Sequence, residues 1–260
     1  SARLFSSVYN IFCHRGNVYF SSTEYLFTWT GKTVSVYAFP RNLNSYWSFL
    51  ASGKIYHGSI SRGLLVFDGK DFIPAPGGEG FVSNPVQAVL PYRDDLLVVF
   101  SSQGVRLYNT ITGQINDFLS RETASWLKGT NIYNAISLPG GRYAIGTIEK
   151  GVIIIDQSGR MVNRIDKSRR LQDEGVTSLY AGDTTATGQG LWVTLSSGIS
   201  YAQIFSPIRI LGEEQGIEGE ITDVVKFNGT VYIAAGRKVY YLKGEDTPDA
   251  AFIPFAGISS

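Results

Sequence analysis

A short motif repeats six times along this chain of 260 residues, and it limits the possible folds more than any other feature. Its clearest copies consist of an apolar segment, a short polar turn, a glycine and a second apolar segment. The pivot positions of the copies are Glu24, Gly63, Gly104, Gly151, Gly198 and Gly236. Their spacing corresponds to a period of about 40 to 45 residues, which is typical of the four-stranded blades of β-propellers.

Additional short apolar segments flank most copies and would complete four strands per repeat. The candidate inner strands are residues 8–12, 86–90, 132–136, 176–180 and 221–225, and the candidate outer strands are residues 114–118, 161–165, 208–211 and 251–255. Aromatic residues make up 13% of the chain and glycines are frequent, which favours strands and turns. No repeat shows the apolar spacing of an amphipathic helix.

We therefore predict an all-β chain with one domain, residues 1–260, folded as a β-propeller of about six four-stranded blades. The blade-like repeats cover residues 6–44, 45–84, 85–128, 129–172, 173–217 and 218–260. The ring could close with six blades or be a piece of a larger, seven-bladed one. Residues 1–5 could be an outer strand of a preceding blade, or could pair with the last blade and close the ring.

Turn chemistry explains the glycines at the pivots. A tight turn between the second and third strands calls for positive φ, which glycine adopts at the lowest cost. The Asn228-Gly229 pair predicts a two-residue turn between the first and second strands of the last blade, with positive φ at both residues. A role in cradling phosphate is not indicated, because no Gly-x-Gly-x-x-Gly sequence precedes a helix.

The repeat resembles that of the two-component regulator propeller family. The segment from Tyr143 to Asp156 is similar to the family pattern, with Gly146-Thr147, Gly151 and the closing Asp156 in place. Leu191-Trp192-Val193 supplies the tryptophan form of the motif, although Thr194 stands where glycine is usual. The segment Leu171–Leu179 resembles the family's link between blades. The resemblance covers most of the chain, and it is weakest in the first and last repeats.

This resemblance implies the extracytoplasmic sensor region of a bacterial membrane signalling protein, on the periplasmic or extracellular side of the inner membrane. Such regions are followed by a transmembrane helix and an output domain, and they often contain two propellers in tandem. The chain starts without a methionine or a leader, so we expect it to be part of a longer protein. Contact with a membrane is expected only through flanking segments.

Charge and composition exclude several other classes. The net charge is +1 and the basic residues are scattered, so a nucleic-acid partner is not expected. Cys13 is the only cysteine, which rules out an intrachain disulfide and zinc sites built on two or more cysteines. No apolar run approaches the 20 or so residues of a membrane span.

Residues suited to catalysis are few. The two histidines, His14 and His57, are too few for a three-histidine metal site, so no metal and no cofactor are expected. The serines that recur beside the second turn indicate turn formation rather than nucleophiles. The carboxylate pairs Asp94-Asp95, Asp173-Glu174 and Glu213-Glu214 are expected in turns, and only their distances in space could reveal a glycosidase.

A binding surface remains the best expectation for function, on the loops between second and third strands. In propellers these loops commonly gather at one end of the channel, and loops on a rigid scaffold often carry function. Arg62 and Arg237 could hold a carboxylate or sulfate with two hydrogen bonds each. The candidate ligand-binding residues are Glu24, Arg62, Gln103, Glu149, Lys150, Arg237 and Lys238. Plain solvation of these side chains is the competing interpretation.

Aromatic residues between the blades offer a second candidate surface. Tyr46, Trp47 and Trp126 could stack on a sugar ring, although packing between blades is the favoured interpretation.

Three functions are compatible with the sequence. The first is a non-catalytic domain that senses a small polar ligand, such as an oligosaccharide, for a two-component sensor or regulator. The second is a scaffold for protein partners, which could include a second propeller or a homodimer partner. The third and least favoured is a propeller lyase or glycosidase. A fold alone does not decide among them.

Overall fold

The computed structural model describes residues 7–40, 47–102, 104–169, 171–182, 190–204, 211, 213–244 and 250–255. These residues form six antiparallel sheets, here called sheets one to six. Sheet one contains β1 (Asn10–His14), β2 (Asn17–Ser21), β3 (Tyr25–Trp29) and β4 (Val34–Ala38). Sheet two contains β5 (Ser48–Ala51), β6 (Lys54–Ser59), β7 (Gly63–Phe67) and β8 (Phe72–Pro74). Sheet three contains β9 (Val86–Arg93), β10 (Leu96–Ser101), β11 (Gly104–Asn109) and β12 (Ile115–Asp117).

The remaining strands form sheets four to six. Sheet four contains β13 (Ile132–Leu138), β14 (Arg142–Thr147), β15 (Val152–Ile155) and β16 (Met161–Ile165). Sheet five contains β17 (Val176–Ala181), β18 (Gly190–Leu195) and β19 (Gly198–Gln203). Sheet six contains β20 (Ile221–Phe227), β21 (Thr230–Ala235), β22 (Lys238–Lys243) and β23 (Ala251–Pro254). Short 3-10 helices lie at Gly78–Phe81, Lys167–Arg169 and Glu213–Gln215.

Every sheet is a simple meander in which each strand pairs with the next strand along the chain. The six predicted strand pairs around the pivots are thereby confirmed. The predicted first strand, residues 8–12, is displaced toward the C-terminus, and β1 covers Asn10–His14 because it pairs directly with β2 from His14 opposite Asn17. A fourth strand of sheet five was predicted at residues 208–211, and most of that segment lies outside the described residues, as do residues 1–5.

Positive-φ pairs form the turn between the first two strands of several sheets. Asn228 and Gly229 have φ values of 47° and 81°, which confirms the predicted turn of sheet six. The same type of pair occurs in three other sheets, at Arg15-Gly16, Ser52-Gly53 and Gly140-Gly141. Such turns match the right-handed twist of the strands that they join, so they set the register of each hairpin.

The pivot glycines serve two purposes. Gly63, Gly104, Gly151 and Gly236 have positive φ, as predicted. The prediction is wrong for Gly198, which starts β19 in the strand ladder, opposite Leu195. At Gly63 a β-carbon would also collide with the carbonyl oxygen of Gly78. Glycine there is thus required by the close approach of the following linker as well as by the turn.

The end of the third strand carries a recurring Asn or Asp that shapes the outer turn. The Asp156 carboxylate accepts hydrogen bonds from the Ser158 and Arg160 backbone amides, at 2.8 and 3.0 Å. Asp68 accepts two backbone amides in sheet two, and Asn109 does the same in sheet three. This arrangement lets a short polar side chain close the turn without help from the core.

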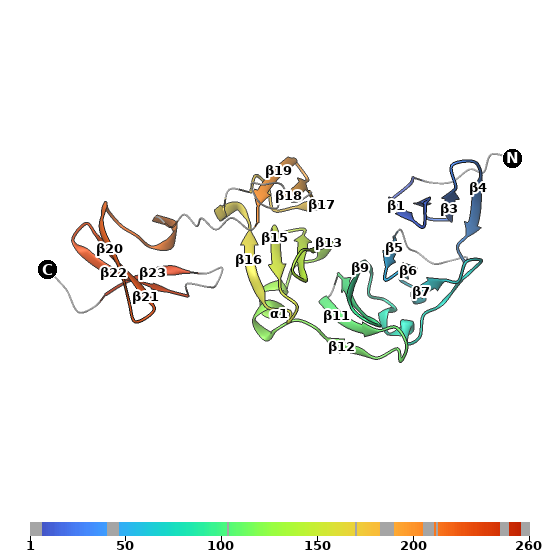
Figure 1. Ribbon diagram of the computed structural model, residues 1–260, viewed down its shortest axis with the longest axis horizontal. Coiled ribbons are helices and arrows are strands. Elements are labelled where there is room, and N and C mark those ends of the chain that lie inside the picture. Colours follow the sequence, from blue (N-terminus) through green and yellow to red (C-terminus); the bar gives the residue numbers. More distant parts are fainter. Residues whose placement is uncertain are drawn as a thin grey trace.

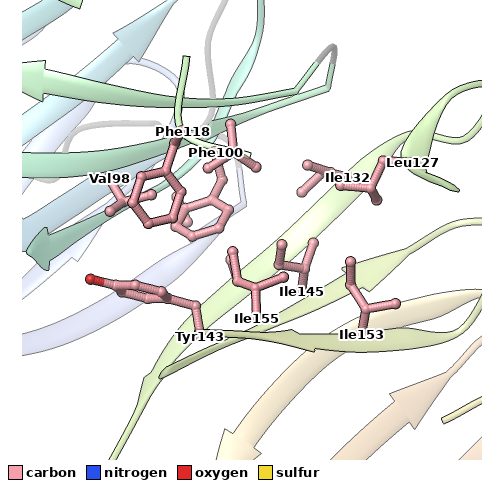
Figure 2. Close-up of a cluster of buried hydrophobic side chains, with 12 residues drawn as sticks. Val98, Phe100, Phe118, Leu127, Ile132, Tyr143, Ile145, Ile153 and Ile155 are labelled. Atoms are coloured by element: carbon pink, nitrogen blue, oxygen red, sulfur yellow. The ribbon is translucent and has the colours of Figure 1, made fainter. Parts of the chain in front are cut away.

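Sheets one to five stack face to face in chain order, and each neighbouring pair shares an apolar cluster. Figure 2 shows the cluster between sheets three and four, where Phe100 and Phe118 face Tyr143 and Ile145. The innermost strands β5, β9, β13 and β17 lie side by side in succession. This is the arrangement expected of successive propeller blades.

One α-helix lies between sheets three and four. α1 (Arg121–Leu127) begins after Ser120, whose hydroxyl accepts the Thr123 amide as an N-cap. Trp126 and Leu127 pack on the cluster between the two sheets. This helix was not predicted, because its seven residues form fewer than two turns, too few to show helical periodicity in the sequence.

The stack does not close into a ring. In Figure 1 sheets one to five follow a curved arc, and sheet six lies apart from the arc beyond sheet four. Whether the sheets close into a ring of six blades or belong to a larger one was left open by the sequence, and in this structure the stack is open. The physical reason is that sheet six packs its buried side chains on its own linker, around Ile217, instead of on sheet five. Within the described ranges, no helix has the length and apolar character that crossing a membrane requires.

Candidate ligand-binding edge

The loops between second and third strands lie beside the linkers that enter and leave their sheets. The backbone amide of Ser102 donates to the Pro85 carbonyl at 3.0 Å, just ahead of β9. Equivalent hydrogen bonds, from a loop amide to a linker carbonyl, occur in sheets four, five and six. The donor and acceptor residues are Ile148 and Asn131, Ser196 and Gly175, and Gly236 and Glu220. We call the edge formed by these loops and linkers the loop edge.

Linkers also join the loops of neighbouring sheets. Between sheets four and five, the Gly151 amide donates to Glu174 and the Ser196 amide donates to Gly175. Between sheets two and three, the Ser83 amide donates to the Ile60 carbonyl at 2.8 Å, two residues before Pro85. Successive loops are thus held at the same edge of the stack, as the sequence analysis predicted.

Hydroxyl side chains shape these loops from within. The Ser22 hydroxyl accepts the Glu24 and Tyr25 amides at 3.2 and 3.0 Å, and the Thr147 hydroxyl accepts the Lys150 amide at 3.0 Å. Ser101 donates to the Gly104 carbonyl at 2.9 Å. The prediction that loop serines form turns is confirmed for Ser22 and Ser101.

Two of the candidate ligand-binding residues hold the linker after α1. The Lys150 ammonium donates to the carbonyls of Trp126 and Lys128, at 2.7 and 3.0 Å, and lies 5.3 Å from the centre of the Trp126 ring. The neighbouring Glu149 carboxylate accepts the Thr130 hydroxyl at 2.5 Å. Both side chains already have strong partners, so a ligand would have to compete for them.

Lys238 and Asp173 have similar roles in the last two sheets. The Lys238 ammonium lies 2.6 Å from the Glu218 carboxylate on the linker into sheet six. Asp173 accepts the Glu174 amide at 2.7 Å and the Ser197 hydroxyl at 3.0 Å, and these hydrogen bonds hold the pKa of its carboxyl below the usual value. A carboxylate that stays ionised at neutral pH is a poor general acid for a glycosidase.

The other candidates are spread along the loop edge. Glu24, Arg62 and Arg237 lie in the loops of sheets one, two and six, and all three side chains are exposed. Gln103 lies outside the described residues. The Ser22 hydroxyl donates to the Glu24 carboxylate at 3.3 Å within the loop of sheet one. The three candidates therefore lie on the loops of three different sheets.

The aromatic candidates have packing roles where they are described. Trp126 packs on the cluster between sheets three and four. The Trp47 ring lies edge-on to Tyr9 at 6.0 Å, between sheets one and two. Tyr46 lies outside the described residues. The interpretation of Trp47 and Trp126 as contacts between blades is therefore confirmed.

A buried polar chain joins sheets one and two and was not predicted. Ser21 and Ser48 lie 3.0 Å apart through their hydroxyls, and Ser48 lies 2.9 Å from His57 Nδ1. All three side chains are buried, and the His57 ring stacks on Phe39 at 4.0 Å. Burial lowers the pKa of His57 to about 3. This serine–histidine pair is closed to a substrate, and it is a structural element.

Buried tyrosines also act as structural donors. The Tyr143 hydroxyl donates to the Pro91 carbonyl at 2.8 Å, and Tyr108 donates to Pro76 at 2.7 Å. Burial raises the pKa of Tyr143 to about 12. Within the part of the chain that the structure describes, no three His, Cys, Asp or Glu side chains cluster as metal ligands would.

Known structures provide the remaining comparison, since no family model and no curated protein matches the sequence. The extracellular domain of BT4673 from B. thetaiotaomicron superposes with a TM-score of 0.58 and 14% identity, over 98% of this chain and 36% of that one. The structure of YCF48 bound to D1 peptide superposes with a TM-score of 0.57 and 10% sequence identity, over 97% of this chain and 82% of that one. Both are propeller folds. The six sheets are propeller blades.

A third structure, the extracellular domain of BT3049 from B. thetaiotaomicron, superposes with a TM-score of 0.56 and 15% sequence identity, over 96% of this chain and 35% of that one. BT4673 is assigned in its two structures to a one-component and to a hybrid two-component system, and BT3049 to a hybrid two-component system. The chain spans about a third of the length of these domains. At these identities the likeness establishes the fold, and it agrees with the family resemblance of the repeat.

Proposed function

We propose that this chain is an extracytoplasmic ligand-sensing propeller domain of a bacterial transmembrane signalling receptor, a two-component sensor or regulator. The observation that carries the proposal is the likeness to the extracellular domains of such proteins along nearly the whole chain. The domain would lie on the periplasmic or extracellular side of the inner membrane and would have no catalytic activity of its own. Its blades would form a propeller ring, of six blades or of more.

The ligand class follows from the chemistry of the loop edge. Exposed Arg62 offers a planar fork of donors in the loop of sheet two, and exposed Glu24 offers acceptors in the equivalent loop of sheet one. Arg237 offers the same fork in sheet six, which lies apart from the arc in this structure. Hydroxyl groups recur in the same loops. Such mixed donors and acceptors suit a small polar ligand with several hydroxyl or acidic groups, such as an oligosaccharide.

A thermal-shift screen of acidic and neutral oligosaccharides tests this proposal. A ligand that binds only the folded state raises Tm, by an amount that grows with its concentration. We expect Arg62→Ala to abolish the shift, while Lys70→Ala preserves it, because Lys70 is exposed in the outer turn of the same sheet. No shift from any member of the screen, or an equal loss in both variants, contradicts the proposal.

A scaffold for protein partners is the second candidate. Two observations favour it: YCF48, which has the same fold, is seen with a bound peptide, and several sheet faces of this chain expose large apolar side chains. A second propeller or a homodimer partner could cover such faces. Light scattering of the purified chain would detect a homodimer, and pull-down from the native host would identify another partner. A lyase or glycosidase is least supported, and turnover of any substrate in a polysaccharide panel would establish one.

A further inference from the structure

The innermost strands of sheets three to six each contain a β-bulge near their first residue. In sheet three, Val86 lies opposite Ser101 and Ala88 lies opposite Phe100, so one extra residue stands between the two pairs. Sheets four, five and six show the same shift at the same position. The extra residues, each the second residue of its strand, are Gln87, Tyr133, Thr177 and Thr222. A bulge interrupts the alternation of a strand and changes the direction of a side chain.

In sheet four the bulge residue belongs to neither packed face. Sheet three covers one face of this sheet and sheet five covers the other, with Ile132 packed toward sheet three and Ile136 toward sheet five. Tyr133 is nevertheless 36% exposed. Because β14 pairs with one edge of β13, the open side of β13 is its inner edge, on the concave side of the arc (Figure 1).

Neighbouring inner strands bring the bulge residues to the same level. β9, β13 and β17 lie side by side in succession. A β-carbon on Gly146 would collide with the side chain of Val176, the residue before Thr177. Glycine at this position therefore allows the start of β17 to approach sheet four closely. We call the surface formed by Gln87, Tyr133 and Thr177 the inner wall.

Two amide side chains at the inner wall have oxygen atoms that are shielded from solvent. Gln87 Oε1 and Asn134 Oδ1, the latter next to Tyr133, accept no hydrogen bond from the residues that the structure describes. Almost all shielded polar atoms in proteins have a partner, so these oxygens indicate a position for donors from outside the chain. The Gln87 side chain is only half-buried, and rotation of its amide would bring the oxygen to the surface.

We propose that the inner wall binds a neutral oligosaccharide, with the Tyr133 ring stacked on a sugar ring and the Gln87 amide hydrogen-bonded to sugar hydroxyls. A tyrosine ring offers a flat apolar surface, and amide and hydroxyl groups both donate and accept hydrogen bonds. The inner wall contains no charged side chain, so it offers nothing that would favour an acidic sugar. The inference rests on the ligand class proposed above and deepens it, because it names a neutral sugar and the residues on which it stacks.

Calorimetric titration with four neutral sugars tests the inner wall: maltohexaose, cellohexaose, xylohexaose and mannohexaose. We expect at least one of them to bind, and Tyr133→Ala to weaken its binding by about ten-fold, because the stacked ring is lost. Tyr180→Ala is the matched control and should leave the affinity unchanged. Tyr180 is also an exposed tyrosine of an inner strand, but it lies opposite Trp192 on the open face of sheet five.

Gln87→Leu separates a ligand contact from a structural role. Because Oε1 has no partner among the described residues, an apolar side chain of similar size should leave the Tm of the ligand-free protein unchanged or higher. The same substitution should weaken sugar binding, because a donor and an acceptor are lost. A lower Tm together with unchanged affinity would show that this amide stabilises the fold instead, and would overturn its assignment to the ligand.

The outcomes distinguish the inner wall from the proposed function. A hexasaccharide that binds Tyr133→Ala as tightly as the unsubstituted protein, but no longer binds Arg62→Ala, would overturn the inner wall and leave a sugar site at the loop edge. Loss of binding in Tyr180→Ala alone would place the sugar on sheet five, and binding of acidic sugars alone would remove the neutral ligand. Both results overturn the inference. No binding of any neutral or acidic sugar would overturn the oligosaccharide proposal as well.

Discussion

The buried His57 is the residue whose surroundings differ most from those its type usually has. It contacts Ser48 and Phe39, and its burial lowers the pKa of the ring, so the folded protein keeps the imidazole neutral at neutral pH. The unfolded chain binds a proton at this residue below pH 6.5, whereas the folded chain does so only near pH 3. Stability contributed by neutral His57 is therefore complete above pH 6.5 and is lost as pH falls toward 3.

We predict that the free energy of unfolding decreases by about 1.4 kcal/mol per pH unit through this residue below pH 6.5. His57→Gln should remove that part of the slope in denaturant titrations between pH 4 and 7, and should lower stability at pH 7 by about 1–3 kcal/mol. Ile111→Gln is the control, because Ile111 is exposed by 64% and carries no titratable group, so this change should leave the slope unchanged. An identical slope in both variants would count against a buried neutral His57.

Gly151 and Gly140 form a second test at the scale of single residues. Both have positive φ, near 70°, in the same sheet. Nothing lies near the β-carbon position of Gly140, whereas a β-carbon on Gly151 would collide with the Ile165 carbonyl oxygen. We predict a loss of about 1 kcal/mol for Gly140→Ala, from backbone strain alone, and a clearly larger loss for Gly151→Ala. Equal losses, measured by urea unfolding, would show that only φ matters at the pivot.

At the scale of elements, the contact between Lys150 and α1 fixes the linker between sheets three and four. The ammonium donates to two carbonyls at the end of the helix, where a positive charge is favourable. We predict that Lys150→Met lowers the free energy of unfolding by about 1–2 kcal/mol. Lys128→Met, which removes an exposed ammonium and keeps the backbone carbonyl, should have little effect. Equal stability of the two variants in chemical denaturation would contradict the structural role of Lys150.

The sequence predicts an element well where a long apolar pattern marks it. It predicts an element poorly where contacts with other parts of the chain determine its position. The pairs β14–β15 and β21–β22 follow directly from apolar segments around a pivot. α1 is too short for periodicity, and its position depends on Lys150 and on the cluster that receives Trp126. The candidate site shows the same division: the common edge of the loops was predictable, but the partners of Glu149 and Lys238 lie in linkers whose path the sequence does not reveal.

On the scale of the whole molecule, the apolar clusters link five sheets in a series. The cluster with Leu65 joins sheets one and two, and the cluster with Val193 joins sheets four and five, with two further clusters between them. We predict that these sheets unfold as one cooperative unit. Leu65→Ala and Val193→Ala, far apart in the stack, should both lower the Tm of the same calorimetric transition. Two transitions that respond separately to the two substitutions would contradict this coupling.

The closure of the stack was beyond what the repeat could predict. The repeated motif indicates that each sheet has two faces to bury, but it does not indicate which part of the chain packs on each face. In this structure Ile217 of the linker occupies the face of sheet six that a neighbouring sheet would otherwise meet. Whether a linker or a neighbouring sheet packs on this face depends on tertiary packing, which local sequence patterns do not encode.

The meander order of every sheet has a consequence during synthesis. Because each strand pairs with the one just before it, a sheet can form soon after its four strands have left the ribosome, without waiting for distant segments. Sheet one, however, leaves the ribosome before the other five sheets, with the exposed side chains of Trp29 and Val34 on its surface. Its outer surface stays exposed to solvent while the other sheets are translated. The growing chain is therefore most prone to aggregation, and most in need of chaperones, during this interval.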